Sequence, residues 1–217
     1  MLSGLWVSTV TEIVGRETRN AYRHLGLNTC VHSSRVLHTV LRREGVRSEP
    51  AAVSVMALDA VSLAEFKAGL PMSGFMYYVG PDAPFLPQDP TVKILTGHAW
   101  NAHMVCTVGP VAESELIVAD VTAPQFSRPE NGVTVEDSVT FDAEADIWSS
   151  GGFVGANLPG GGGLVYRRLG DDVPESLAWR TSSAWTKEGG TIRAIADQCL
   201  RRIARLDIPR EVSASNA

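Results

Sequence analysis

Cys30 is the residue of this chain best placed for nucleophilic chemistry. It follows Asn28 and Thr29, two residue types that favour helix N-caps, and it opens the amphipathic segment 30–45. In the first turn of a helix the backbone N–H groups lack intrahelical partners and the dipole is positive, so a thiolate is favoured over a thiol. The same N–H groups can stabilise an oxyanion. Taken alone, the pattern also fits a small apolar residue that only packs at a helix start.

His103 and Asp120 are candidates for the base and the orienting carboxylate that a cysteine nucleophile needs. We expect strands at about 101–108 and 115–121, joined by the loop GPVAES, so that His103 opens one strand and Asp120 closes the next. In this hairpin position 120 pairs with about position 103, and paired residues lie ~5 Å apart. Asp120 then holds one ring nitrogen of His103 and leaves the other facing Cys30.

His98 is the rival base. It lies 22 residues before Asp120, whereas His103 lies 17 residues before it, so the hairpin pairing favours His103. A metal site built from His98, His103 and Cys106 is a further alternative. Residues 103 and 106 face opposite sides of a regular strand, and we therefore expect no metal and no other cofactor.

The remaining pattern predicts which elements position these residues. Helices are expected first, then a sheet, then helices again, which is the order of an α+β fold with the Cys30 helix packed on an antiparallel sheet. The expected helices are 5–24, 30–45, 62–70 with Ser62 as its N-cap, 174–187 and 191–206; the further strands are 51–58, 75–79, one within 134–141, and 164–169. We expect a single domain over 1–217, with a core at about 20–170 and a C-terminal helical extension at about 171–210.

Composition narrows the class of protein. Of the residues, 44% are hydrophobic and 20% charged, which is ordinary for a globular domain, and the net charge of -5 argues against nucleic-acid binding. The three cysteines are too scattered for a disulfide framework, so reduced thiols in the cytoplasm are expected. The first residues lack the pattern of a signal peptide, and no stretch approaches 18 uninterrupted apolar residues, so no membrane association is expected. The oligomeric state is left open.

Three segments together resemble the transglutaminase-like branch of the papain-like cysteine enzymes. They are CVHSSRVLHTVLRREGVRSEP, HMVCTV and LIVADVTAPQFSRP, and the resemblance covers about residues 28–128. It implies a papain-like fold in which Cys30 is the nucleophile, His103 the base and Asp120 its orienting partner. It further implies a thiol hydrolase or acyl transferase acting on an amide bond of a peptide, a protein or a small molecule.

The chain also departs from this pattern. Papain-like enzymes usually carry a Gln several residues before the cysteine to complete the oxyanion hole, whereas here His24 stands six residues before Cys30 with no Gln between them. His24 or the Asn28 amide is the candidate substitute, although His24 also fits an ordinary helix-end histidine. Trp100 and Gln125 are candidates for the cleft wall, and Gln125 alternatively ties down its own loop.

Two other functions stay open. The arylamine N-acetyltransferases use a similar triad, but the arginine- and glycine-rich approach to their cysteine is missing from GLNTC. The second open function is that of a binding module, which keeps the papain-like fold but has no catalytic activity, because a fold does not by itself confer activity.

Overall fold

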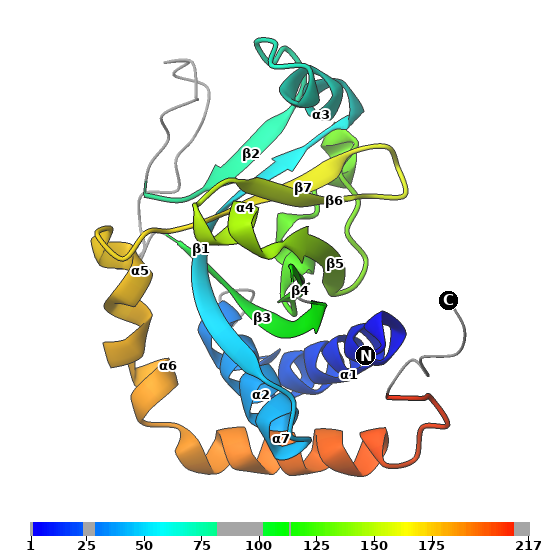
Figure 1. The fold of residues 1–217 in the computed structure, drawn as a ribbon, viewed down its shortest axis with the longest axis vertical. Coiled ribbons are helices and arrows are strands. Elements are labelled where there is room, and N and C mark those ends of the chain that lie inside the picture. Colours follow the sequence, from blue (N-terminus) through cyan, green and yellow to red (C-terminus); the bar gives the residue numbers. More distant parts are fainter. Residues whose placement is uncertain (1, 24–28, 82–101, 113, 211–217) are drawn as a thin grey trace.

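Three helices cover one face of a strongly curved sheet (Figure 1). The structure is a computed structural model that describes residues 2–23, 29–81, 102–112 and 114–210. The covering helices are α1 (Gly4–Ala21), α2 (Cys30–Arg43) and α7 (Gly189–Ile203). The others described are shorter: α3 (Ala60–Lys67), α4 (Ala145–Ser149), α5 (Pro174–Ala178), α6 (Ser183–Thr186), and the 3-10 turns η2 (Ala123–Phe126), η3 (Pro129–Asn131) and η4 (Trp179–Thr181).

The described strands form one antiparallel sheet in the order β5-β4-β3-β1-β7-β6, with β2 paired to the far end of β1. Their bounds are β1 (Ser48–Leu58), β2 (Met76–Val79), β3 (His103–Ala112), β4 (Glu115–Asp120), β5 (Val139–Glu144), β6 (Phe153–Asn157) and β7 (Gly163–Arg168). The edge strands β5 and β6 contact each other, so the sheet curls until it nearly closes. The predicted α+β class, with the Cys30 helix on an antiparallel sheet, is confirmed.

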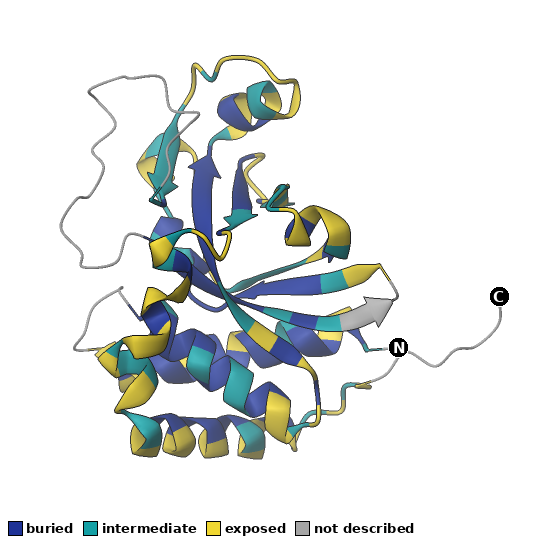
Figure 2. Ribbon diagram, turned by 60° about the vertical axis from the view of Figure 1, so that its left-hand side comes forward, coloured by how far each residue is buried: buried dark blue, intermediate teal, exposed yellow. Residues whose placement is uncertain are grey.

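The two faces of the sheet carry separate hydrophobic cores, which Figure 2 shows as buried strands above buried helix faces. In β3, Cys106 and Val108 pack with the apolar faces of α1, α2 and α7. Val105 points the other way, into a core that includes Phe126 and Tyr166. This alternation is the period of two expected for a strand, and it fixes which face His103 occupies.

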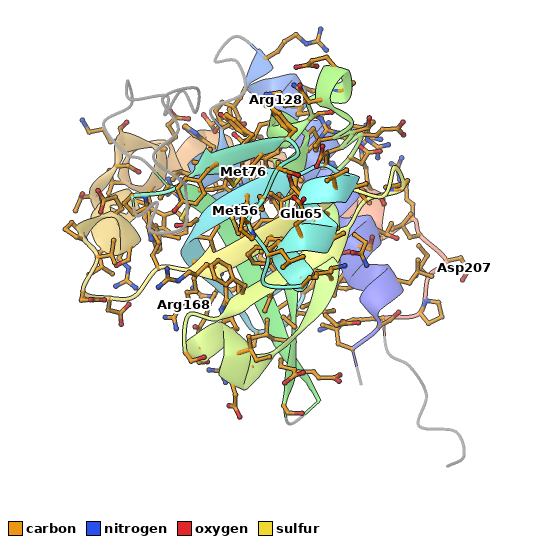
Figure 3. The ribbon with its side chains drawn as sticks, turned by 90° about the horizontal axis from the view of Figure 1, so that it is seen from above. Met56, Glu65, Met76, Arg128, Arg168 and Asp207 are labelled. Atoms are coloured by element: carbon orange, nitrogen blue, oxygen red, sulfur yellow. The ribbon has the colours of Figure 1, made fainter. Side chains whose placement is uncertain are left out.

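A smaller cluster closes one end of the sheet beneath α3. Met56 of β1 and Met76 of β2 belong to it, together with Leu63 of α3, while Glu65 lies on the outer side of the helix (Figure 3). Asp59 caps α3 by accepting a hydrogen bond from the backbone N–H of Ser62. The prediction that Ser62 is the cap is therefore wrong, because the carboxylate three residues earlier reaches that N–H.

Two other local predictions need correction. Pairing in the central hairpin continues through Ala112 with a bulge after Val108, so residues 109–112 belong to β3 rather than to the loop. Gly109 has φ 142°, a backbone conformation open mainly to glycine. The expected helix 174–187 is broken into α5, η4 and α6, and the strand β6 carried no prediction. Within the described ranges no helix is both long and apolar enough to cross a bilayer.

Candidate functional site

His103 and Asp120 form a buried pair on the face of the sheet away from the long helices. The ring Nε2 of His103 lies 2.9 Å from Oδ2 of Asp120, and their side chains are 1% and 0% exposed. The observed register pairs Cys106 with Ala119, so the next residue of β4, Asp120, lies opposite Val105. The predicted pairing of 120 with 103 is thus wrong by two positions. The contact still forms, diagonally, because residues two apart on a strand share a face.

Asp120 receives hydrogen bonds from three parts of the chain. Besides His103, the backbone N–H of Thr122 donates to Oδ1 at 2.9 Å and the Tyr166 hydroxyl donates to Oδ2 at 3.0 Å. A buried carboxylate with this many donors is held in one orientation. Tyr166 comes from β7, two strands away from β3 across β1, and sequence reasoning missed it. No local pattern marked it, since its partner lies 46 residues away.

The environment of His103 favours its protonated form. Burial alone lowers the pKa of this imidazole, but the charge and hydrogen bond of Asp120 and a smaller interaction with Cys30 outweigh burial and raise the pKa to about 10. Phe126 packs edge-on against the ring, with ring centroids 4.9 Å apart. The base candidate is therefore an imidazolium near neutral pH, held between a carboxylate and a thiol.

Gln125 contacts the second ring nitrogen. Its side-chain amide lies 2.8 Å from Nδ1 of His103 and 3.4 Å from the hydroxyl of Thr122, because η2 turns residue 125 back over the end of β4. An amide can donate to a neutral Nδ1 through its NH₂ group, or, turned over, accept from an imidazolium N–H through its oxygen. Gln125 therefore suits both protonation states of the ring.

Cys30 is the first residue of α2 and is partly exposed. Its neighbour Val31 packs with Met104 of β3, which brings the start of the helix to the end of the strand that His103 opens. Thr29 is the N-cap residue but its side chain makes no capping hydrogen bond, so its hydroxyl does not occupy the first backbone N–H groups of α2. The structure thus brings Cys30, His103, Asp120 and Gln125 together from three separate segments.

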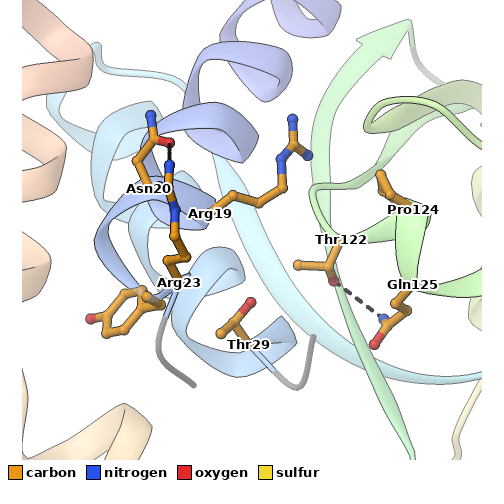
Figure 4. Close-up of a pocket in the computed structure, with 8 residues that line it drawn as sticks. Arg19, Asn20, Arg23, Thr29, Thr122, Pro124 and Gln125 are labelled. Atoms are coloured by element: carbon orange, nitrogen blue, oxygen red, sulfur yellow. Dashed lines mark hydrogen bonds between the residues drawn. The ribbon is translucent and has the colours of Figure 1, made fainter. Parts of the chain in front are cut away.

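A pocket of about 290 Å³ opens beside this group (Figure 4). The last turn of α1 forms one wall, the segment Thr122–Gln125 forms the other, and Thr29 lies between them. The lining residues are Arg19, Asn20, Tyr22, Arg23, Thr29, Thr122, Pro124 and Gln125. A small molecule in this pocket would lie next to the residue that precedes Cys30.

Four candidates from the sequence, His24, Asn28, His98 and Trp100, lie outside the described residues, so the oxyanion donor and the rival base stay predictions. Among the described residues no group of His, Cys, Asp and Glu is arranged to hold a metal ion. Cys106 lies on the helix side of β3, where its thiol donates to the carbonyl of Ser34 at 3.2 Å, and so faces away from His103.

The comparisons with known proteins add no relative: no family model, no curated protein and no solved structure matches this chain.

Proposed function

We propose that this protein is a thiol-dependent hydrolase or acyl transferase that cleaves an amide bond with Cys30, His103 and Asp120. The observation that carries the proposal is the buried imidazole of His103, held 2.9 Å from the Asp120 carboxylate and interacting with the Cys30 thiol, an environment that raises the pKa of the ring. An imidazolium of this kind stabilises a neighbouring thiolate, which is the reactive form of cysteine. The proposed arrangement of the three residues is papain-like and transglutaminase-like.

The proposed mechanism begins with attack of the Cys30 thiolate on the carbonyl carbon. As the S–C bond forms, the C=O π bond breaks and its electron pair moves to oxygen, and the tetrahedral oxyanion accepts hydrogen bonds from backbone N–H groups in the first turn of α2. His103 transfers its proton to the departing nitrogen, the C–N bond breaks, and a thioester remains on Cys30. Neutral His103 then removes a proton from water or from an acceptor amine, whose attack on the thioester releases the product and restores the thiolate.

Asp120 serves this cycle without exchanging a proton. Its carboxylate holds Nε2 of His103, which leaves Nδ1 as the nitrogen that exchanges a proton, and it stabilises the positive ring in both halves of the reaction. Water as acceptor gives hydrolysis, and an amine gives acyl transfer. The three cysteines are all unpaired, which fits the further proposal that the protein works in the reducing cytoplasm.

The test is formation of an acyl-enzyme on Cys30. Wild-type protein incubated with p-nitrophenyl acetate is expected to gain one acetyl group at Cys30, with a burst of nitrophenolate, because an activated ester bypasses substrate recognition. Cys30→Ala should abolish both signals. Cys199→Ala is the matched control, since Cys199 is buried in α7 and should leave both signals unchanged. A wild-type protein whose Cys30 is acetylated no faster than a small free thiol is a binding module, and the proposal is then wrong.

A further inference from the structure

The pocket beside Cys30 is lined by positive charge, although the chain as a whole is acidic. The whole chain has 24 acidic and 19 basic side chains, yet among the described residues two arginines and no carboxylate line this pocket. Arg19 lies in the last turn of α1, and Arg23 follows directly after the C-cap residue Tyr22. Figure 4 shows both of them on the α1 side, with Thr122 and Gln125 opposite.

Arg23 has the less engaged guanidinium of the two. Its Nη2 donates to the side-chain oxygen of Asn20 at 3.3 Å, and within the described part of the chain no carboxylate pairs with it. Arg19 pairs with Asp137 at 3.2 Å, but both side chains are largely exposed, so water competes for this contact. The other nearby carboxylate, Glu188, accepts from the Tyr22 hydroxyl at 3.0 Å. Donor capacity toward the pocket therefore remains, chiefly on Arg23.

We infer that this pocket binds a carboxylate on the substrate, and that Arg23, with Arg19 beside it, recognises that group. The guanidinium fork matches a carboxylate, and Thr29, whose hydroxyl makes no capping hydrogen bond, adds a neutral donor to the same pocket. The inference rests on the proposed function, because it names the substrate class of that same site. The substrate is then an amide that carries an acidic group near the bond that Cys30 attacks.

The size of the pocket fits such a group. A volume of about 290 Å³ admits a side chain or a small acid but not a folded partner. Its position next to Thr29 places the bound carboxylate one residue from the nucleophile along the chain. A neutral substrate would place no negative charge against the guanidinium of Arg23, whose hydrogen bond in the described residues goes to the neutral Asn20 amide, so its binding is weaker.

Matched alkylating probes test the inference without knowledge of the natural substrate. N-iodoacetylglycine carries a carboxylate, and N-iodoacetylglycinamide is its neutral twin; a second pair with a γ-aminobutyrate spacer covers a longer reach. The rate of alkylation at Cys30 is measured by intact-protein mass with peptide mapping. Each ratio of anionic to neutral rate is divided by the same ratio for free N-acetylcysteine amide, which cancels the intrinsic reactivity of the probes.

The wild-type ratio is expected to exceed that of the free thiol by about fivefold for at least one pair, as a partly exposed guanidinium–carboxylate contact allows. Arg23→Gln should remove the preference, Arg19→Gln should reduce it, and 0.5 M salt, a value chosen to screen exposed charges, should suppress it. Arg16→Gln is the control, since Arg16 is exposed on α1 and does not line the pocket.

The outcomes separate the two claims. Ratios equal to the free thiol for both pairs, or a preference that survives Arg23→Gln, overturn the carboxylate inference. Slow reaction of Cys30 with the neutral probes, no faster than the free thiol, overturns the proposed function instead. A preference for the anionic probes on an otherwise unreactive cysteine supports the pocket as a carboxylate site and rejects the chemistry.

Discussion

Two histidine–carboxylate pairs flank the first turn of α2, and they differ in burial and in the number of hydrogen-bond donors around the carboxylate. His103 and Asp120 are 2.9 Å apart and closed off from water. His32, two residues after Cys30, lies 3.3 Å from Glu188, with side-chain exposures of 11% and 37%. The buried carboxylate accepts hydrogen bonds from three residues, His103, Thr122 and Tyr166, whereas Glu188 contacts His32 and the Tyr22 hydroxyl and is partly exposed.

The difference shows what burial adds to the same contact. A charge pair near water gains little, because water solvates both partners equally well. A buried pair must be satisfied from within the protein, and Thr122 and Tyr166 do this for Asp120. Of the two pairs, only the buried one therefore fixes its histidine in one orientation. Asp120 holds Nε2 of His103, and Nδ1 faces other groups of the site. We expect substitutions at the two pairs to have very different consequences.

Removing each histidine is expected to give the largest contrast. His103→Gln should slow acetylation of Cys30 by p-nitrophenyl acetate by about 100-fold or more, the usual contribution of a positioned base. His32→Gln should change the rate by less than roughly twofold, because its ring pairs with Glu188 and takes no part in the mechanism. Stopped-flow measurement of nitrophenolate release checks both. Equal losses in the two variants would contradict the assignment of His103 as base.

Removing the charge of each carboxylate should separate the pairs in stability. Asp120→Asn leaves an imidazolium without its buried counter-charge and turns an amide NH₂ toward other donors, so about 3–5 kcal/mol of unfolding free energy should be lost. Glu188→Gln should fall within the small range of ordinary surface substitutions. Urea unfolding followed by circular dichroism measures both. A small effect at Asp120 would show that the pair is not held as described.

The two tyrosines that donate to these carboxylates give a finer contrast. Tyr166→Phe removes a buried hydrogen bond to a charged group and should cost about 1.5–3 kcal/mol. Tyr22→Phe removes a part-buried hydrogen bond to Glu188, whose side chain is 37% exposed, and should cost about 0.5–1 kcal/mol. Thermal unfolding of the two variants under identical conditions checks the order. A larger loss for Tyr22→Phe would reverse the comparison.

The pH dependence of stability is the smallest and most selective effect. The pKa of His103 is raised from about 6.5 in the unfolded chain to about 10, so its contribution is complete below pH 6.5 and declines as the pH rises toward 10. The unfolding free energy should therefore fall between pH 6.5 and 8.5, by at most ~1.4 kcal/mol per pH unit. His103→Gln should flatten this slope, and His32→Gln should keep it.

The other groups with shifted pKa values affect stability outside the range of pH 6.5 to 8.5. Burial lowers the pKa of His38, so its effect on stability falls below pH 6.5. Burial raises the pKa of Cys106 and Cys199, which places their effects above pH 8.5. A wild-type stability that rises between pH 6.5 and 8.5 would contradict the raised pKa of His103.

Part of this site could be predicted from the sequence because its signals are local. Capping residues and an amphipathic period place Cys30 at a helix start, and alternation places His103 and Asp120 at the ends of neighbouring strands. The register could not be predicted to the residue, because the bulge after Val108 depends on how β3 pairs with both β1 and β4. Because the error was an even number of residues, Asp120 still lies on the same face of the sheet as His103.

Other parts of the site had no local signal. Tyr166 reaches Asp120 because β1 pairs with β3 on one side and with β7 on the other, an arrangement that no single segment encodes. Gln125 was expected at the cleft wall, but its contact with Nδ1 of His103 depends on the path of η2. The charge of the pocket arises where α1 ends opposite residues 122–125, a meeting of segments about 100 residues apart.

The pH dependence of Cys30 alkylation by iodoacetamide, in wild-type protein and in His103→Gln, tests the central claim most directly. If His103 carries a proton that stabilises the Cys30 thiolate, the wild-type rate should change little between pH 5.5 and 8, and His103→Gln should react slowly at low pH and faster as the pH rises. A wild-type rate that climbs about tenfold per pH unit over this range, unchanged by His103→Gln, would contradict the account.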